Sequence, residues 1–252
     1  MSGQARPMIT WLHAGLVGEP FPPPSQAWLE PNGLLAAGGD LSVPRLLRAY
    51  RQGIFPWYEA GQPILWWSPD PRTVLEPAAL RVPRSLRRSI RKGGFEISFD
   101  REFEAVVRAC GGPRAGASGT WITVEMRHAY LQLHRAGHAH SLEVWRGGEL
   151  VGGLYGVTVG RVFCGESMFS RATDASKVGL AWLCRHLVAW DWPLIDSQTP
   201  TPHMLAMGAC EIPRERFLAR LRRLVDQDPG PRVWEVDPTI HPLDAGWRSA
   251  DA

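Results

Sequence analysis

Two short apolar segments carry polar side chains that are suited to binding a charged or reactive group. Glu166 follows a glycine inside the segment 161–169. Asp196 lies at the end of the segment 193–197, and Gln198 comes directly after that segment. Residues two apart on a strand share one face, so Asp196 and Gln198 are predicted to project together. A buried acid is either satisfied by internal hydrogen bonds or used in a site. Two such positions on successive strands favour a site at the strand ends.

Lys177 is one of only two lysines in a chain whose Lys and Arg residues number 28. It lies at the predicted start of a helix, where the helix dipole disfavours a cation without a partner. An ammonium group is either required there for a specific contact or retained by chance, and its role stays open.

Other polar positions do not form a recognisable metal or nucleotide site. His138 and His140 have no third ligand at suitable spacing, so surface or capping roles are expected and no metal is predicted. The glycines of 152–156 lie between strands with no helix start after them, which favours close strand packing over phosphate binding. The four cysteines are widely spaced and are expected to be reduced, buried side chains of a cytoplasmic protein: Cys110, Cys164, Cys184 and Cys210.

Two segments are typical of nucleic-acid contact. The segment 81–92 is basic and contains no acid, and at helical spacing its arginines share a face: Arg84, Arg87, Arg88 and Arg91, with Lys92 beside them. A solvated basic face is the alternative. The segment 54–72 sets aromatic rings among four prolines, either as a core plug or as a stacking platform.

The composition is that of a folded globular chain. The 252 residues are 44% hydrophobic and 21% charged, with a net charge of +3, which excludes extended disorder and allows a core without disulfides. No apolar run approaches the roughly 20 residues that span a bilayer, and no signal-like segment is present, so neither membrane insertion nor export is expected.

Periodicity predicts the elements that position these side chains. Helices are expected over 43–53, over 101–110, through about 136, over 174–190 and from 212. Strands are expected over 95–99, 141–145, 149–160, 161–169 and 193–197, and the three from 141 to 169 are joined by short turns and predicted to be antiparallel. This order predicts an α+β fold with a mixed sheet.

Several motifs resemble the leucyl/phenylalanyl-tRNA–protein transferase family. They follow the family's order through most of residues 21–218: EPNGLLAAGGDLS (30–42), AYRQGIFPWY (49–58), ILWWSPDPR (64–72), TWIT (120–123), GHAHSLEVW (137–145), LVGGLYGV (150–157), FCGESMFS (163–170), ASK (175–177) and IDSQ (195–198). The resemblance implies a small N-terminal α+β domain, assigned to 1–75, and a C-terminal domain similar to the N-acetyltransferase fold, assigned to 76–252.

The resemblance also implies an activity. Members of this family transfer Leu, Phe and less readily Met from aminoacyl-tRNA to the N-terminal Arg or Lys of a protein, and the new peptide bond marks that protein for degradation through the N-end rule pathway. No metal, nucleotide or acetyl-CoA is expected as a cofactor, and a monomer is expected. The amino acid is already activated as an ester on tRNA, which agrees with the lack of a nucleotide motif in the sequence.

Residue roles carried over from the family cover both substrates. Asp196 is expected to orient Gln198, whose amide oxygen would accept a proton of the attacking amine, and Glu166 to supply negative charge for the cationic acceptor. The apolar pocket for the donor side chain corresponds to Leu154, Met168, Leu180, Leu183 and Leu187. Trp57 and Trp121 match tryptophans near the 3′-terminal adenosine. Phosphates of the acceptor stem would be bound by Arg84, Arg87, Arg88, Arg91 and Lys92.

The sequence departs from the family's pattern at three of these places. Leu183 and Leu187 stand where aromatic rings are common, which bears on the balance between Leu and Phe, and Ser197 stands where Cys is common. Two other classes stay open. One is a coenzyme-A-dependent N-acetyltransferase. The sequence argues against this class, because it has no glycine-rich turn before a helix that could bind the pyrophosphate. The other is an RNA-binding module, which would leave Glu166, Asp196 and Gln198 without a purpose.

Overall fold

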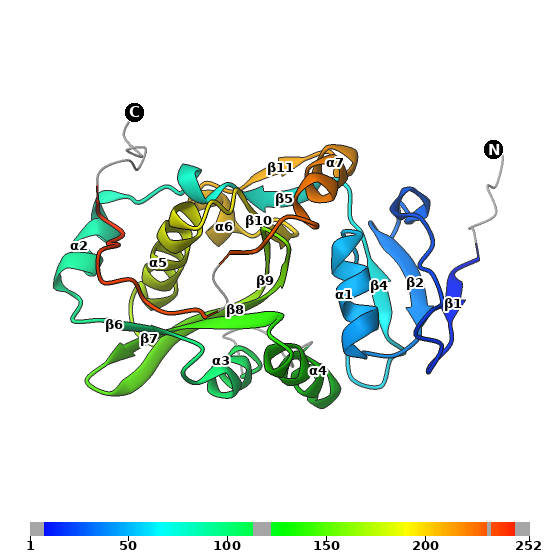
Figure 1. Cartoon of the computed structure of the whole chain (residues 1–252), viewed down its shortest axis with the longest axis horizontal. Coiled ribbons are helices and arrows are strands. Elements are labelled where there is room, and N and C mark those ends of the chain that lie inside the picture. The colour runs from blue at the N-terminus through cyan, green and yellow to red at the C-terminus, as the bar shows by residue number, and fades with distance from the viewer. Residues whose placement is uncertain (1–7, 113–121, 231–232, 245–252) are drawn as a thin grey trace.

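The computed structural model describes residues 8–112, 122–230 and 233–244, and these form two β-sheets (Figure 1). The smaller sheet has the strand order β1-β2-β4-β3, with bounds Thr10–Leu12, Leu34–Gly38, Leu65–Trp67 and Phe55–Pro56. The larger has the order β11-β5-β10-β9-β8-β7-β6, with bounds Cys210–Ile212, Arg72–Leu75, Leu194–Gln198, Val162–Ser170, Glu149–Val159, Ala139–Arg146 and Glu96–Phe99. β9 and β10 run parallel while β7, β8 and β9 are antiparallel, so the predicted α+β fold with a mixed sheet is confirmed.

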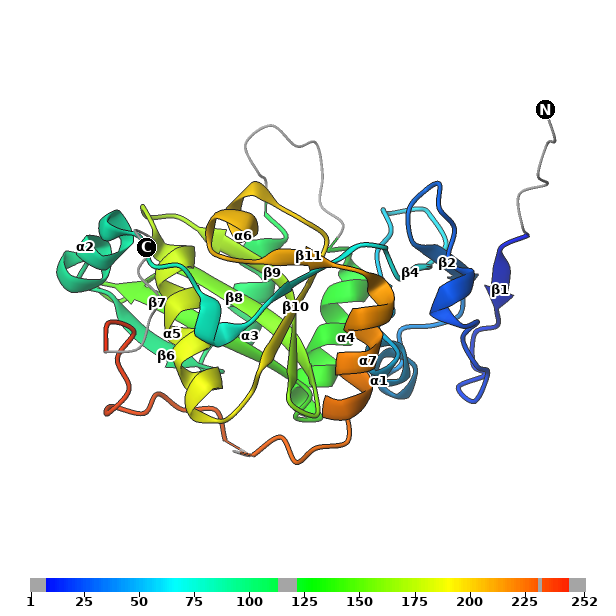
Figure 2. The same ribbon diagram turned by 90° about the horizontal axis from the view of Figure 1, so that it is seen from above.

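Helices cover both faces of the larger sheet (Figure 2). α5 (Ala175–Ala189) packs on one face, and α3 (Phe103–Cys110) and α4 (Val124–Arg135) pack on the other. Alternation along β8 produces these two layers, because Leu154 joins the core beneath α5 and its neighbour Tyr155 joins the core beneath α3 and α4. The described chain also contains α1 (Val43–Arg51), α2 (Arg84–Lys92), α6 (Pro202–Ala206), α7 (Arg214–Leu224) and two short 3-10 turns, Pro24–Gln26 and Pro77–Ala79.

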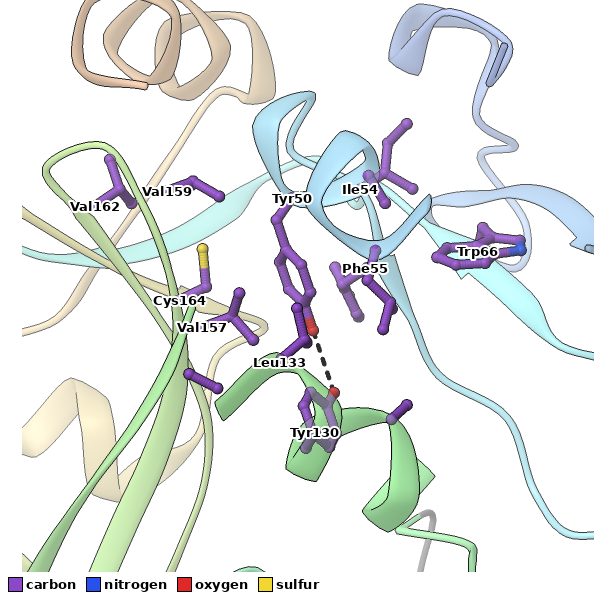
Figure 3. Packing of buried hydrophobic residues seen from close by; sticks show 14 of the residues in the cluster. Tyr50, Ile54, Phe55, Trp66, Tyr130, Leu133, Val157, Val159, Val162 and Cys164 are labelled. Carbon is purple, nitrogen blue, oxygen red and sulfur yellow. Dashed lines mark hydrogen bonds between the residues drawn. The ribbon is translucent and has the colours of Figure 1, made fainter. Parts of the chain in front are cut away.

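α1 lies between the two sheets and shares a core with both (Figures 1 and 3). Its buried Tyr50 belongs to the cluster that includes Trp66 of the small sheet and Val157 of β8. The helix is followed by Gly53 at φ +72°, where a Cβ would approach the Leu218 side chain at 2.6 Å. Glycine is therefore required for the chain to turn from α1 into the aromatic segment.

The predicted helices and strands are present with shifts of a few residues at their ends, but the sequence did not predict β1 to β5, which include the whole small sheet, nor α6 and β11. The strands β1 to β5 have two to five residues each. α6 and β11 have five and three residues, too few to show a period. The expectation that all four cysteines are buried is wrong for Cys210, which is exposed on β11. β11 pairs only with β5 and forms an edge of the sheet. No helix in the described ranges is both long and apolar enough to cross a bilayer.

β5 joins the two parts of the chain. The sequence assigned residues 1–75 to an N-terminal domain, and β5, the last four residues of that range, pairs with β10 and β11 of the larger sheet. The division at residue 75 stays a prediction, and the strand at that boundary belongs to the larger sheet. Residues on β5 are consequently next to the predicted catalytic strand β10.

Candidate active site

A cavity of about 590 Å³ lies against β8, β9, the end of β10 and the N-terminal half of α5. Two of the three residues predicted to be catalytic line it, Glu166 on β9 and Gln198 at the end of β10. The strand order makes this possible, because β9 and β10 are hydrogen-bonded neighbours that run in the same direction. Two of the predicted site residues thus line one partly open cavity, Gln198 from the end of β10 and Glu166 from the middle of β9.

Glu166 is held at the cavity wall by two tyrosines from different helices. Tyr50 on α1 donates to Glu166 Oε1 at 2.8 Å, and Tyr130 on α4 donates to Glu166 Oε2 at 2.5 Å. The two hydroxyl oxygens are 3.2 Å apart (Figure 3). Each tyrosine is at most 2% exposed, so both carboxylate oxygens are fixed by rigid partners.

The surroundings of Glu166 move the pKa of its carboxyl group close to neutral pH. Burial raises the pKa of this carboxyl from 4.5 to about 7, and the hydrogen bonds from Tyr130 and Tyr50 oppose that shift because they stabilise the anion. Burial also raises the pKa of both tyrosines, with the Glu166 charge adding to the effect, so they remain hydroxyl donors. Glu166 therefore changes charge within the range where an α-amino group does.

Asp196 lies behind the cavity wall and is not among the lining residues. Its carboxylate is bound on both oxygens by Arg72 of β5, with Nε to Oδ1 at 2.8 Å and Nη2 to Oδ2 at 2.7 Å. Both side chains are at most 2% exposed. Such a bidentate pair is short and directional, and it restricts the carboxylate to one orientation.

The prediction that Asp196 and Gln198 share a strand face by simple alternation is wrong. The pairing of β10 with β5 shifts between these residues, and Gln198 has a left-handed backbone with φ +56°. Asp196 Oδ1 instead accepts the main-chain N–H of Gln198 at 3.1 Å. The bulge leaves Asp196 buried and turns Gln198 to the cavity, so the contact between them runs through the backbone.

The apolar part of the cavity contains four of the five residues predicted for the donor pocket: Leu154, Met168, Leu180 and Leu183. Leu187 is fully buried in the core and is not on the lining, although it shares a face of α5 with Leu180 and Leu183. Phe163 and Ile195 also line the cavity and were not singled out from the sequence. The lining suits an aliphatic or aromatic side chain.

The aromatic segment contributes to both the core and the cavity, so the core role holds for some of its rings, and the stacking role stays a prediction for the others. Trp66 is fully buried, whereas Trp57 lines the cavity and is 48% exposed. Trp57 has a ring contact with Trp67 at 5.5 Å. An exposed indole at a cavity mouth can stack on a base. Trp121 lies outside the described residues.

The basic segment forms α2, as predicted, with Leu86 turned into the core. Arg84, Arg88, Arg91 and Lys92 are exposed. Arg87 is half-buried, and its Nε donates to the main-chain oxygen of Val82 at 3.0 Å. Its guanidinium is therefore partly committed within the chain, which distinguishes it from the other arginines of the helix.

Lys177 has the partner that a cation at a helix start needs. Its Nζ is 2.9 Å from Asp174 Oδ1, and Ser89 of α2 donates to the other oxygen of Asp174 at 2.7 Å. The ion pair and the hydrogen bond tie the start of α5 to the basic helix. Lys177 also lies close enough to His203 to lower its pKa, although burial is the larger cause.

His203 lines the cavity and was not identified from the sequence. It lies on the five-residue helix α6, and its Nε2 is buried without a hydrogen-bond partner in the described part of the chain. No periodic or motif signal marks this position. An unsatisfied imidazole nitrogen at a cavity is a group that a bound substrate can satisfy.

The surface or capping role expected for His140 is wrong, because this side chain is buried on β7. His140 Nδ1 lies 2.6 Å from Asp100 and its ring stacks on Trp234 at 4.2 Å. A Cβ at Gly156 would approach the main-chain oxygen of Cys164 at 2.4 Å, in agreement with the predicted close packing of strands. Within the described ranges, no three His, Cys, Asp or Glu side chains are grouped so that they could hold a metal ion.

Comparison with known proteins gives one consistent family. The family model described as leucyl/phenylalanyl-tRNA protein transferase matches residues 74–222, and the model of that family's N-terminal domain matches residues 39–70. Similar proteins named leucyl/phenylalanyl-tRNA–protein transferase occur in Pseudomonas syringae, 56% identical over 87% of this chain and 95% of the relative, and in Azotobacter vinelandii, 60% identical over 82% and 91%. A relative of the same name from Stutzerimonas stutzeri is 55% identical over 91% of this chain and all of its own.

Proposed function

Because the chain belongs to the leucyl/phenylalanyl-tRNA–protein transferase family, we propose that it transfers Leu or Phe, and less readily Met, from aminoacyl-tRNA to an N-terminal Arg or Lys of a protein. The observation that carries this proposal is that Glu166, Gln198 and four apolar donor-pocket residues line one cavity. The product would begin with a large apolar residue and enter N-end rule degradation. A cytoplasmic monomer is part of the proposal.

The donor side chain is proposed to bind in the apolar part of the cavity. Leu180 and Leu183 of α5 and Met168 of β9 all line this volume. Burial of a Leu or Phe side chain contributes about 1.5–3 kcal/mol. The terminal adenosine is proposed to stack on Trp57, with Trp121 as the second ring expected from the family resemblance.

The acceptor is proposed to bind beside Glu166. Its carboxylate, held by Tyr50 and Tyr130, offers a negative charge to the cationic N-terminal residue. An acidic N-terminal residue would place two negative charges together in a partly closed cavity, which is unfavourable. This arrangement supports selection of Arg and Lys.

The reaction needs positioning more than strong acid or base groups. The acceptor α-amine attacks the ester carbonyl of the aminoacyl-tRNA, the C–N bond forms and the bond to the ribose oxygen breaks. A proton leaves the amine and a proton is delivered to the ribose oxygen. The Gln198 amide oxygen is too weakly basic to take the proton outright, and its proposed role is to accept a hydrogen bond from the amine and direct its lone pair.

The acceptor stem of the tRNA is proposed to lie along α2. Arg84, Arg88, Arg91 and Lys92 present exposed cations on a helix that Ser89 links to the start of α5. Contacts to phosphates fix position without reading sequence, which suits an enzyme that accepts more than one tRNA.

One assay separates this proposal from the alternatives. The protein is incubated with an Arg-starting peptide and either Leu-tRNA or acetyl-CoA, and the peptide is analysed by mass spectrometry. Addition of leucine from Leu-tRNA supports the transferase. Acetylation would support an acetyltransferase, and an unmodified peptide together with bound tRNA would support an RNA-binding module.

A further inference from the structure

Arg72 is the partner of the predicted catalytic carboxylate, and neither the sequence patterns nor the family resemblance singled it out. It lies on β5, which is antiparallel to β10, and its guanidinium binds both oxygens of Asp196 at 2.7 and 2.8 Å. Both groups are fully buried. A buried pair of this kind is sensitive to loss of one partner, because the other charge is then left without compensation.

The Asp196 carboxylate accepts hydrogen bonds from two residues, Arg72 and Gln198. Oδ1 accepts from Arg72 Nε and from the Gln198 main-chain N–H, and Oδ2 accepts from Arg72 Nη2. The carboxylate does not line the cavity where the substrates are proposed to meet. Its geometry is that of a support for the Gln198 backbone.

Arg72 also contacts the N-terminal part of the molecule. Its guanidinium carbon lies 4.9 Å from the ring centre of Phe55 on β3 and 4.7 Å from that of Phe217 on α7. Phe55 lines the cavity and is two residues before Trp57. One arginine therefore contacts the aromatic segment on one side and the catalytic strand on the other.

We infer that Arg72 is a positioning residue for the transfer reaction, and that the Arg72–Asp196 pair acts by holding the bulged backbone that presents Gln198 to the acceptor amine. In this arrangement Asp196 does not exchange a proton during the reaction. The activity assay of this inference rests on the proposed function. The hydrogen bond from the Gln198 main-chain N–H to Asp196 can be tested without substrate.

The left-handed backbone of Gln198 explains why such support is needed. A non-glycine residue at φ +56° is in a sparsely populated region and persists only where its surroundings hold it. The Asp196 carboxylate provides the acceptor for its N–H, and Arg72 prevents the carboxylate from rotating away. Without this support the amide of Gln198 would sample other positions in the cavity.

The test compares two neutralising changes alone and together. Arg72→Gln leaves the Asp196 charge buried, and Asp196→Asn leaves the Arg72 charge buried, so each is expected to lower kcat by about 100-fold through misplacement of Gln198. The double variant Arg72→Gln/Asp196→Asn has no buried charge, and Asn still offers an oxygen to the Gln198 N–H. It is expected to recover to within about tenfold of the wild type. If Asp196 exchanged a proton, the double variant would be no more active than Asp196→Asn, and the inference would be wrong.

Two further variants distinguish an effect on Gln198 from a general loss of folding. Arg72→Lys keeps the charge but not the bidentate geometry. It is expected to lower kcat by about tenfold and to leave the KM for Leu-tRNA within about twofold of the wild-type value. A kcat equal to that of the wild type would contradict the inference. The matched control is Arg45→Gln, which changes a fully buried arginine whose partners are Asp40, Glu19 and the main-chain oxygens of residues 13 and 16, none of which lines the cavity. Its kcat per folded molecule is expected to be unchanged.

Hydrogen exchange at the main-chain amide of Gln198 distinguishes failure of this inference from failure of the proposed function. The exchange rate without substrate is expected to rise in Arg72→Gln and to return toward the wild-type rate in the double variant. Unchanged exchange in Arg72→Gln would refute the inference even if the wild type transfers leucine. Absence of transfer by the wild type with the expected exchange pattern would count against the proposed function alone.

Discussion

Tyr50 on α1 and Glu166 on β9 are 116 positions apart in the chain and are joined by a hydrogen bond of 2.8 Å. The bond links the helix between the two sheets to the wall of the cavity. Together with Tyr130 it fixes the only carboxylate that the described residues contribute to the lining. The pH dependence of activity and of stability therefore reports on the protonation of Glu166 in the cavity.

Activity toward an Arg-starting peptide is expected to depend on the ionisation of Glu166. Because its pKa is about 7, the carboxylate is lost as the pH falls through 7, and the rate should drop about tenfold for each pH unit below it. The acceptor amine titrates at about 7.7–8.0 in every variant. The ratio of wild-type to Glu166→Gln rates across pH 5.5–8.5 isolates the carboxylate. A ratio that stays constant would show that Glu166 does not act as a charge.

The same group is expected to make stability depend on pH. Its pKa is near 4.5 in the unfolded chain and about 7 in the folded one, so between these values the folded protein binds one more proton. Its contribution is fully present below pH 4.5 and is lost as the pH rises through 7, by about 3 kcal/mol in total. Urea unfolding of the wild type and Glu166→Gln at pH 5 and pH 8 measures this difference. Parallel pH dependences would contradict the raised pKa.

Removal of a tyrosine hydroxyl is expected to move the pH profile upward. Tyr130→Phe and Tyr50→Phe each delete a hydrogen bond that stabilises the Glu166 anion, so the pKa of Glu166 should rise further and the acid limb should move to higher pH. Tyr58→Phe is the control, because the Tyr58 hydroxyl contacts Thr123 instead. An acid limb that stays in place in the Tyr130 and Tyr50 variants would indicate that another group controls it.

The size of residue 183 is expected to set the balance between donors. Leu183→Phe reduces the cavity and should lower Phe transfer more than Leu transfer, whereas Leu183→Ala should favour Phe, each by about 1–3 kcal/mol. Leu187→Ala is the matched control, since Leu187 shares the helix face but is not on the lining. It should cost about 2–5 kcal/mol of stability without changing the ratio of Phe to Leu transfer. An equal fall for both donors in the Leu183 variants would place the selective pocket elsewhere.

The exposed arginines of α2 are expected to bind tRNA without regard to its identity. Arg84→Ala and Arg88→Ala should weaken binding of tRNA(Leu) and tRNA(Phe) alike and lower the salt dependence by about one phosphate contact each. Arg135→Ala, at the exposed end of α4, is the control. A loss confined to one tRNA, or an unchanged salt dependence, would contradict phosphate binding by this helix.

The sequence predicted the strands β6 to β10 and the polar residues of the site, but it predicted neither the small sheet nor the partners of those residues. Helical spacing predicted the shared buried face of Leu180 and Leu183 on α5, because that pattern is local, whereas Leu154 was assigned to the pocket from the family resemblance. The partners of Glu166 and Asp196 come from distant segments, and Arg72 is 124 positions from Asp196. Spacing carries no information about such pairs.

Irregular backbone explains most of the remaining errors. The shift in β10 between Asp196 and Gln198 breaks the two-residue period, so the rule that placed both side chains on one face failed there. His203 lies on a helix of five residues, which is too short for a pattern to be recognised. Leu187 was assigned to the donor pocket from the family resemblance, and its place on the buried face of α5 does not distinguish the core from the cavity lining.

The most direct test of the proposed site measures leucine transfer from Leu-tRNA to two peptides that differ only in beginning with Arg or with Asp. The wild type is expected to add one leucine to the Arg peptide and to leave the Asp peptide unmodified, and Gln198→Ala is expected to lose the transfer while still binding tRNA. Equal transfer to both peptides, or full activity of folded Gln198→Ala, would contradict the assignment of the reaction to the cavity formed by Glu166 and Gln198.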